Sequence, residues 1–230
     1  MKMKKYRFLL LLLVSFFLYV GCQENDIDLY NETLRLNFYY GNMDVYFVDT
    51  DYVKGHTEKE WMLRVNLQGD RLPEERSFCL KVQPNEAYSL KANISFDEKY
   101  VFPMDSIYQI VTIKVHRPEA LTVTSAYQAD IYFDLDNPLH QFDPGREDRE
   151  HLSMNVYYRI KRNDWNEWYW GKYADSKYFF MMDYFGVTHD GIPTTQEAQK
   201  NLYDAYEEYK KSNPPLLDEN GEEIVFKQVN

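Results

Sequence analysis

The chain has 230 residues, of which 44% are hydrophobic, 17% aromatic and 27% charged, a balance typical of globular proteins. Its net charge is −11, and it becomes −15 without residues 1–21, because they hold four of the 26 basic residues and no acidic ones, leaving 22 basic against 37 acidic. A chain of this charge repels phosphate backbones, so we expect no nucleic-acid partner.

The first 21 residues have the pattern of a bacterial lipoprotein signal. A basic start precedes thirteen largely apolar residues, 8–20, too few to span a membrane as a helix. The segment ends LYVGC, which resembles a lipobox: the peptidase cuts before Cys22, whose thiol carries the lipid. Tyr19 stands where Leu is commonest. An ordinary secretory signal or an uncleaved anchor with a chance cysteine is the alternative.

Residues 22–33 are polar and acidic, which is typical of a short tether. Early acidic residues resemble the surface-export signals of Bacteroidetes lipoproteins, although a solvated linker explains them equally well. We therefore expect a protein anchored to the outer membrane through a lipid on Cys22, on the periplasmic or the cell-surface side. Cys79, in an apolar alternating run, is expected to be a buried small side chain.

Between residues 34 and 138 the dominant hydrophobic period is two, which predicts strands. Turn signals such as QGDRLPEE, HRPEA and DNP separate the runs, and long loops are expected at 53–60 and 93–106. Short strands at this spacing predict an immunoglobulin-like β-sandwich over 34–138. The predicted strand runs are 34–40, 43–49, 60–69, 76–84, 108–118 and 125–138.

Residues 139–230 predict a smaller C-terminal α+β region. A polar stretch, 140–151, forms the boundary or a long loop, and residues 154–162 read as a strand or a short helix. Residues 194–215 predict a helix capped by Thr194 or Thr195, with an apolar stripe that packs on the sheet. Asn220-Gly221 predicts the turn of a hairpin over 216–226. The fold class is thus mainly β.

Several segments together resemble one family. They are the lipobox, VYFVD, VNLQGDRLPEERSFCLKV, FPMDSIYQIVTIKVHRP, YQADIYFDL and WGKYADSKYFFMMD. The chain resembles the DUF4843 family of Bacteroidetes lipoproteins over nearly its whole length, with Ala174 in place of the usual Ser of a GKYS-x-x-K segment. The resemblance implies a place beside outer-membrane nutrient-uptake systems of the SusC/SusD kind and carries no activity. The β-rich half also resembles Calx-beta and other immunoglobulin-like sandwiches, but no calcium ligands transfer.

Catalytic and metal motifs are weak. The five histidines are scattered, and no zinc-protease, nucleophile-elbow or phosphate-loop pattern occurs. Acid pairs such as Asp49 with Asp51 and Asp134 with Asp136 are expected to face water rather than hold calcium. We therefore expect no enzyme, metal or cofactor, and keep a hydrolase as the remote alternative.

Three Trp and five other aromatic residues fall within residues 164–180. Trp165, Trp168 and Trp170, with Asp164 and Asn166 between them, could present aromatic faces to sugar rings and polar groups to sugar hydroxyls. Core packing is the preferred interpretation, followed by a sugar or peptide platform and then by docking to a partner protein. Overall, the sequence predicts a non-catalytic envelope lipoprotein that binds or assembles within a nutrient (glycan) uptake complex with SusC/SusD-like proteins. The alternative is a glycan-binding module using an exposed Trp cluster.

Overall fold

The computed structural model describes residues 33–121, 125–160 and 162–228. The predicted signal peptide, Cys22 and almost all of the tether lie outside the described residues. Among the helices that are described, none has the length and apolar character needed to cross a membrane. The residues from Leu34 onward form one compact unit.

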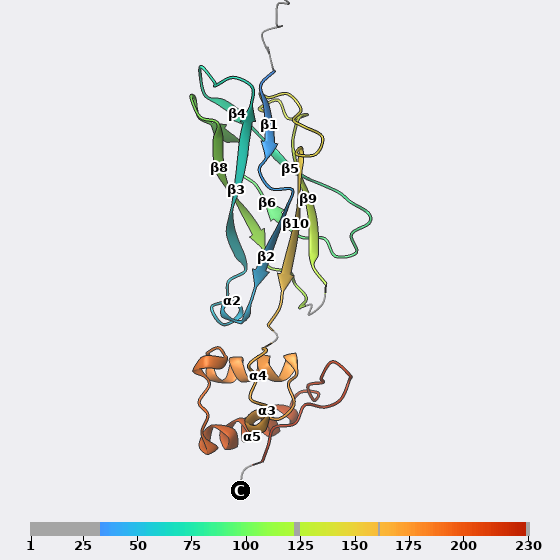
Figure 1. Cartoon of the computed structure of the whole chain (residues 1–230). Helices are drawn as coiled ribbons and strands as arrows, with labels where there is room; N and C mark the ends of the chain where they lie inside the picture. Colours follow the sequence, from blue (N-terminus) through green and yellow to red (C-terminus); the bar gives the residue numbers. More distant parts are fainter. Residues whose placement is uncertain (1–32, 122–124, 161, 229–230) are drawn as a thin grey trace, which may run out of the picture. The chain divides into compact units, whose positions relative to one another are not determined.

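Two four-stranded sheets form a β-sandwich, as Figure 1 shows. The first has the strand order β1-β3-β8-β6 and the second β2-β10-β9-β5, and all the pairings are antiparallel except that of β2 with β10. The strands of the first sheet are β1 (Arg35–Phe38), β3 (Glu58–Gln68), β8 (Tyr108–His116) and β6 (Ile94–Ser95). Those of the second are β2 (Asn42–Phe47), β10 (His151–Tyr158), β9 (Tyr127–Phe133) and β5 (Leu80–Gln83).

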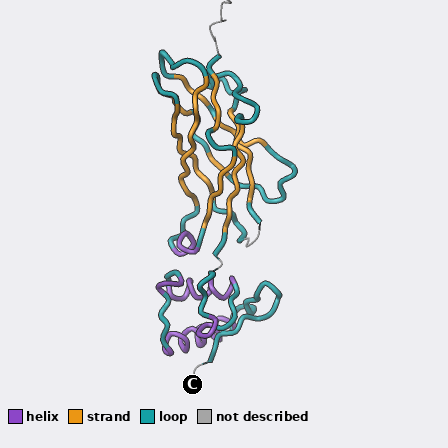
Figure 2. The backbone as a smooth tube through the Cα atoms, viewed as in Figure 1, coloured by secondary structure: helices purple, strands orange, loops and turns teal. Residues whose placement is uncertain are grey.

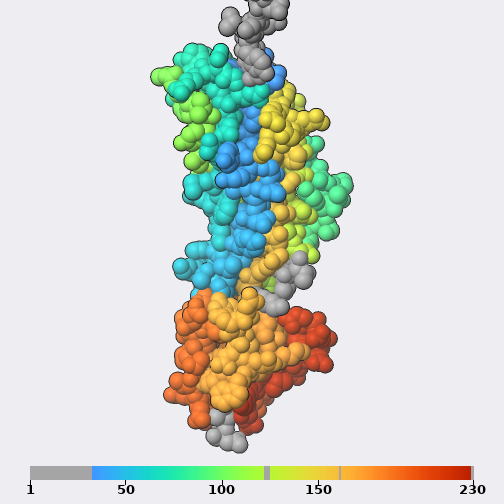
Figure 3. Space-filling model, in the orientation of Figure 1, coloured from blue at the N-terminus to red at the C-terminus, as the bar shows by residue number. Residues whose placement is uncertain are grey.

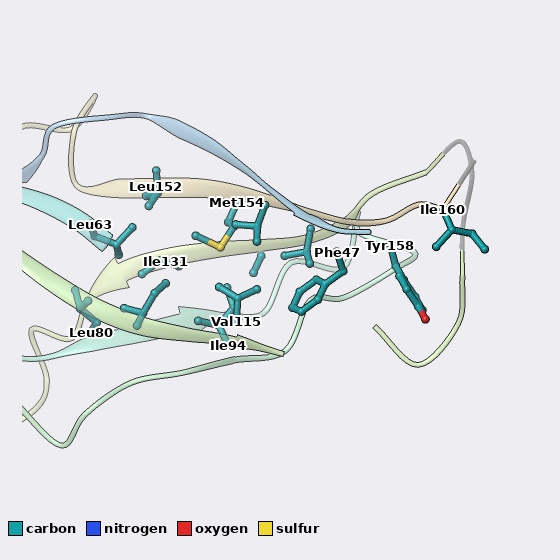
Figure 4. Packing of buried hydrophobic residues seen from close by; sticks show 14 of the residues in the cluster. Phe47, Leu63, Leu80, Ile94, Val115, Ile131, Leu152, Met154, Tyr158 and Ile160 are labelled. Atoms are coloured by element: carbon teal, nitrogen blue, oxygen red, sulfur yellow. The ribbon is translucent and has the colours of Figure 1, made fainter. Parts of the chain in front are cut away.

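The alternating sequence pattern places the core between the two sheets. In β10 every second residue is buried, because successive side chains of a strand point to opposite faces. In β8 of the first sheet the alternate residues Val111, Ile113 and Val115 are buried, and they point toward the second sheet. Figure 4 shows the resulting contact, with Leu63 and Val115 from one sheet near Ile131 and Met154 from the other. The expected mainly β fold with an immunoglobulin-like sandwich is confirmed.

The sandwich extends further along the chain than the predicted boundary at residue 138. Strand β10 lies in the region assigned to the C-terminal part, yet it pairs with β9 and in parallel with β2, from Ser153 beside Asn42 to Tyr158 beside Phe47. Figure 3 shows β10 and β2 side by side on the surface. The sequence obscured this because the polar stretch 140–151 resembles a linker, whereas it is a loop that returns the chain to the sheet.

Two segments, 93–106 and 49–53, differ from their predicted conformation. The expected loop 93–106 contains β6 and β7 (Tyr100–Phe102), and β7 pairs with β4 (Arg76–Phe78) in a small third sheet. Asp49 and Asp51 are buried in a short helix, α2 (Asp49–Val53), so the expectation that they face water is wrong. Asp51 accepts from the backbone of Val48 and pairs with Lys59.

Cys79 is buried, and burial raises the pKa of its thiol. Its backbone N–H donates to Nδ1 of His140 at 3.3 Å, a contact that the sequence did not predict. The thiol itself approaches the carbonyl oxygen of Glu98 at 3.5 Å. The residue is therefore the small buried side chain that the sequence predicts.

After β10 the described chain is helical, apart from an irregular hairpin (Figure 2). The helices are α3 (Glu167–Trp170), α4 (Asp175–Phe185), the 3-10 helix η1 (His189–Gly191) and α5 (Gln196–Lys210). The sequence predicted α5 and its cap: the Thr195 side chain accepts from the N–H of Ala198 at 3.1 Å. It did not predict α4, whose apolar residues form no clear stripe.

The prediction that the apolar stripe of α5 packs on a sheet is wrong, because the stripe packs against α4 and the C-terminal hairpin. Tyr206 contacts Phe180 of α4 and Phe226 of the C-terminal hairpin, with ring centroids 5.4 and 5.2 Å apart. Gly221 lies in the turn of the hairpin, and its φ of 82° favours glycine. The backbones of Leu217 and Glu223 form an isolated antiparallel β-bridge between the two arms. The predicted position of the turn is confirmed, but it is not the type I′ turn that Asn-Gly favours, because Asn220 lacks a positive φ, and its two arms do not form regular strands.

Candidate ligand site in the C-terminal region

The three tryptophans of the aromatic stretch lie in three different environments. Trp170 is buried, with 3% of its surface exposed, whereas Trp168 is 81% exposed. Trp165 is half-buried: its indole N–H donates to the Gly171 carbonyl at 2.8 Å, and its ring packs against Tyr173. The three rings therefore do not form one platform, and only Trp168 is presented to solvent.

This separation follows from the single helical turn of α3. Residues two apart on a helix point about 200° away from each other, so Trp168 and Trp170 face opposite ways. Asn166 begins the turn, since its side chain accepts from the N–H of Tyr169 at 3.1 Å. Gly171 ends it with a φ of 73°. Of the predicted ligand residues, Asn166 is thus a helix cap.

Asp164 belongs to a separate cluster around Arg162. The guanidinium donates to Asp164 through two bonds of 2.9 and 2.8 Å, and Arg162 holds the pKa of that carboxyl below its usual range. Arg162 also pairs with Asp49 at 3.0 Å and with Asp190 at 3.4 Å. Asp164, His189 and Asp190 lie within 4.8 Å of one another, but the guanidinium already supplies the positive charge that a metal ion would bring.

Trp168 stands at a hollow of about 520 Å³ between α3, the start of α4 and the C-terminal hairpin. Lys227 lies over the indole, with its ammonium 5.4 Å from a ring centroid. The wall combines apolar surface with four carboxylates and three ammonium groups. The lining residues are Glu167, Trp168, Gly171, Lys172, Tyr173, Ala174, Lys177, Asp218, Glu222, Glu223, Ile224, Val225 and Lys227.

Lys177 forms the floor of this hollow and is only 2% exposed. Its ammonium donates to the carbonyls of Trp170, Lys172 and Val225, the last two at 3.3 and 2.7 Å. Burial lowers the pKa of Lys177 to about 8, although the nearby Glu167 carboxylate opposes the shift. One side chain thus ties α3, the following loop and the hairpin together. Gly171 leaves room for it, because a Cβ there would lie 3.3 Å from Nζ.

Residues after α3 and in the first turn of α4 fix the hairpin in the same way. Lys172 pairs with Asp218 at 2.7 Å, and the Ser176 hydroxyl donates to the Leu217 carbonyl at 2.7 Å. Ala174 cannot cap α4 with its side chain, and the carboxylate of Glu219 accepts from the N–H of Asp175 instead. The segment from Gly171 to Lys177 therefore shapes the wall of the hollow.

The chain matches the family described as "Domain of unknown function (DUF4843)" over residues 23–187. The chain belongs to the DUF4843 family. Among curated protein sequences, none matches this DUF4843 chain. The match includes the whole sandwich, α3 and α4, and it ends before α5 and the hairpin that complete the hollow.

Three solved structures with a partial likeness to this DUF4843 protein have TM-scores of 0.39, 0.42 and 0.39. The apo form of a Calx CBD1 domain has 17% identity and a TM-score of 0.39, over 56% of this chain and 99% of that domain. A Bacteroides ovatus protein described as a candidate carbohydrate-binding protein has 8% identity and a TM-score of 0.42, over 55% of this chain and 38% of that one. Bacteroides thetaiotaomicron EndoBT-3987, with a Man5GlcNAc product, has 10% identity and a TM-score of 0.39, over 54% and 30%. The DUF4843 chain thus spans less than half the length of these two Bacteroides proteins.

Two of the four carboxylates in the hollow of this DUF4843 protein are engaged in ion pairs. The Lys172 ammonium and backbone N–H groups of the hairpin hold the pKa of Asp218 far below its usual range. Glu223 pairs with Lys210 of α5 at 3.0 Å. These two carboxylates therefore fix the wall of the hollow, and Glu167 and Glu222 are the carboxylates of the lining left outside these pairs.

Sequence reasoning on the DUF4843 chain missed most of this site. It named Trp168 as one of five candidates, but it did not name Lys177, Lys227 or the acidic hairpin that line the same hollow. One signal was available: the segment from Gly171 to Lys177, which carried the family resemblance. Lysine is rarely buried, however, so nothing local showed that Lys177 lies inside.

Proposed function

We propose that this protein is a non-catalytic, lipid-anchored binding component of an outer-membrane nutrient-uptake system, and that it holds a saccharide in the hollow beside Trp168. The observation that carries the proposal is the 81% exposure of the Trp168 indole at the edge of a mixed polar and apolar hollow. The glycan class is the finer part of the proposal and rests on the chemistry of this wall.

A saccharide suits this wall for a physical reason. One face of a pyranose ring is lined by C–H groups and packs on an indole, while its hydroxyls need donors and acceptors around the rim. Trp168 supplies the indole, and the charged groups of Glu167, Glu222 and Lys227 supply the rim. Ligand sites commonly have volumes of roughly 300–1,000 Å³, and this hollow of about 520 Å³ is within that range.

The proposed localisation rests on the sequence. The basic start, the short apolar segment and Gly21-Cys22 support export and lipid attachment at Cys22, on the periplasmic or cell-surface side. A lipid anchor would hold the hollow near a SusC/SusD-like transport complex. Such a position favours capture of a nutrient over its chemical conversion.

A glycan panel tests the proposal directly. The soluble form that begins at residue 23 is titrated with neutral and acidic oligosaccharides, and binding is followed by calorimetry. We expect Trp168→Ala to weaken binding about fivefold or more, since stacking on an aromatic ring contributes on the order of 1 kcal/mol or more. Tyr108→Ala, which removes an exposed aromatic ring from β8, is the matched control and is expected to bind normally.

Circular dichroism confirms that both variants are folded. Saccharide binding that survives Trp168→Ala unchanged would contradict the site, and release of new reducing ends from the panel would favour the hydrolase instead.

A second candidate function, docking to a partner protein, has one observation of its own. The outer face of β3 and β8 carries Met62, Ile110 and Tyr108, which are 68%, 50% and 43% exposed. Large exposed apolar groups on one sheet face are typical of an interaction surface. Met62→Ser combined with Ile110→Ser is expected to reduce co-purification with a SusC/SusD-like complex without affecting saccharide binding. If co-purification is unchanged, this face is not the docking surface.

A further inference from the structure

A second hollow, of about 510 Å³, borders the first and shares two residues with it. Trp168 and Lys227 line both, so they form the common wall between the two hollows. The remaining walls of the second hollow come from α3, from the N-terminal end of α5 and from the chain after the hairpin. Its lining residues are Trp168, Tyr169, Thr194, Gln196, Gln199, Lys227 and Gln228.

The second hollow differs from the first in its chemistry. Apart from Lys227 its polar side chains are uncharged amides and hydroxyls, which can each donate and accept. Thr194 and Gln196 are exposed, whereas Gln199 is buried and its amide donates to the Tyr169 carbonyl at 2.7 Å. The covered hydroxyl of Tyr169 has no hydrogen-bond partner among the described residues. The exposed hydroxyl of Thr194 and the exposed amides of Gln196 and Gln228 can pair with the neutral hydroxyl groups of a sugar.

We propose that the two hollows are consecutive subsites for one neutral saccharide chain, which passes Trp168 and contacts the groups on both sides. The inference deepens the proposed function and rests on it, because it assigns an oligosaccharide to the same indole. A single sugar unit would use one hollow only. A chain of several units uses both, and Lys227, held 5.4 Å above the ring, then lies where the chain crosses.

Charge favours a neutral chain over an acidic one. The first hollow holds four carboxylates against three ammonium groups, and the ammonium of Lys177 is already used by three backbone carbonyls. A uronic-acid chain would meet Glu167 and Glu222 on the same wall. Like charges at such distances repel, so an acidic chain is disfavoured.

The test is a chain-length series on the soluble form that begins at residue 23. Linear cello-, malto-, manno- and xylo-oligosaccharides of one to six units are titrated by calorimetry, with oligogalacturonides of the same lengths for the acidic class. We expect affinity for a neutral series to rise about tenfold or more with length and then level off. Thr194→Val combined with Gln196→Ala is expected to remove that gain while leaving the shortest ligands unaffected.

Each outcome separates the two claims. If Trp168→Ala abolishes binding but affinity is independent of length, or the Thr194 and Gln196 variant binds long chains normally, the second subsite is wrong and the first stands. If oligogalacturonides bind more tightly than every neutral series, the assignment to a neutral chain is overturned. If no saccharide binds, both the inference and the proposed function fail. Glu222→Gln, on the first hollow alone, is the matched control and should weaken short and long ligands equally.

Discussion

At the residue scale, the C-terminal region depends on a buried charge. The Lys177 ammonium satisfies carbonyls from three segments that no strand or helix would otherwise join. Replacing it with methionine keeps most of its volume but leaves three acceptors unpaired. We expect Lys177→Met to lower the free energy of unfolding by about 2–4 kcal/mol, measured by urea denaturation. Lys200→Met, on the exposed face of α5, is the matched control, and equal midpoints for the two variants would contradict this role.

A second residue, Asp130 of β9, gives the sandwich a pH dependence. Burial raises the pKa of this carboxyl, but hydrogen bonds from Asn85, Ser153 and Tyr88, each 2.8–2.9 Å long, together lower it below its usual value. A carboxyl whose folded pKa is depressed contributes stability above its unfolded pKa, near 4, and loses it as pH falls through the folded pKa.

Asp130→Asn is therefore expected to cost about 1–3 kcal/mol at pH 7 and less at pH 3, which is below the unfolded pKa. Urea denaturation at the two pH values measures this difference. A cost that is the same at both would show that the hydrogen bonds to Asp130 do not depend on its charge.

At the element scale, the C-terminal hairpin belongs to the core of the helical region. Phe226 is buried against Phe180 of α4 and Tyr206 of α5, while its neighbour Val225 is 70% exposed. We expect Phe226→Ala to destabilise the helical region by about 3–5 kcal/mol and Val225→Ala to change its stability by less than about 0.5 kcal/mol. Thermal melting followed at 222 nm, where the helices dominate the signal, compares them. Similar losses would place the hairpin outside the core.

Some of the helices and strands could be predicted from the sequence and others could not. The strands and α5 were predictable, because a period of two and a capped amphipathic stripe are local patterns. Helix α4 was not, since it is covered from several sides: Phe179 contacts Tyr52 of α2, and Phe180 contacts both α5 and the hairpin, so no single apolar stripe remains. The parallel pairing of β2 with β10 joins residues more than a hundred positions apart, and no local pattern encodes it. For the same reason Trp168 could be named as a candidate, but its exposure depends on the direction of one helical turn.

At the scale of the whole molecule, we propose that a lipid on Cys22 anchors the binding region to the membrane. If Cys22 carries the lipid, Cys22→Ser is expected to abolish incorporation of labelled fatty acid into the protein and to leave the signal segment attached, because serine has no thiol to take the lipid. Labelling of cells that express the full chain, followed by gel electrophoresis, measures this, with Cys79→Ser as the control that keeps its label. Label that persists in the Cys22→Ser protein would contradict lipid attachment at this residue.

The proposed site requires that Trp168, alone among the three tryptophans of its stretch, is open to solvent. Acrylamide quenching of fluorescence measures this exposure, and a neutral quencher is not repelled by the acidic chain. The measurement uses the soluble form that begins at residue 23, in a Trp61→Phe background. We expect Trp168→Phe to remove most of the quenchable emission and Trp170→Phe to leave it nearly unchanged. If strong quenching survives Trp168→Phe, another indole is the exposed one and the site beside Trp168 is wrong.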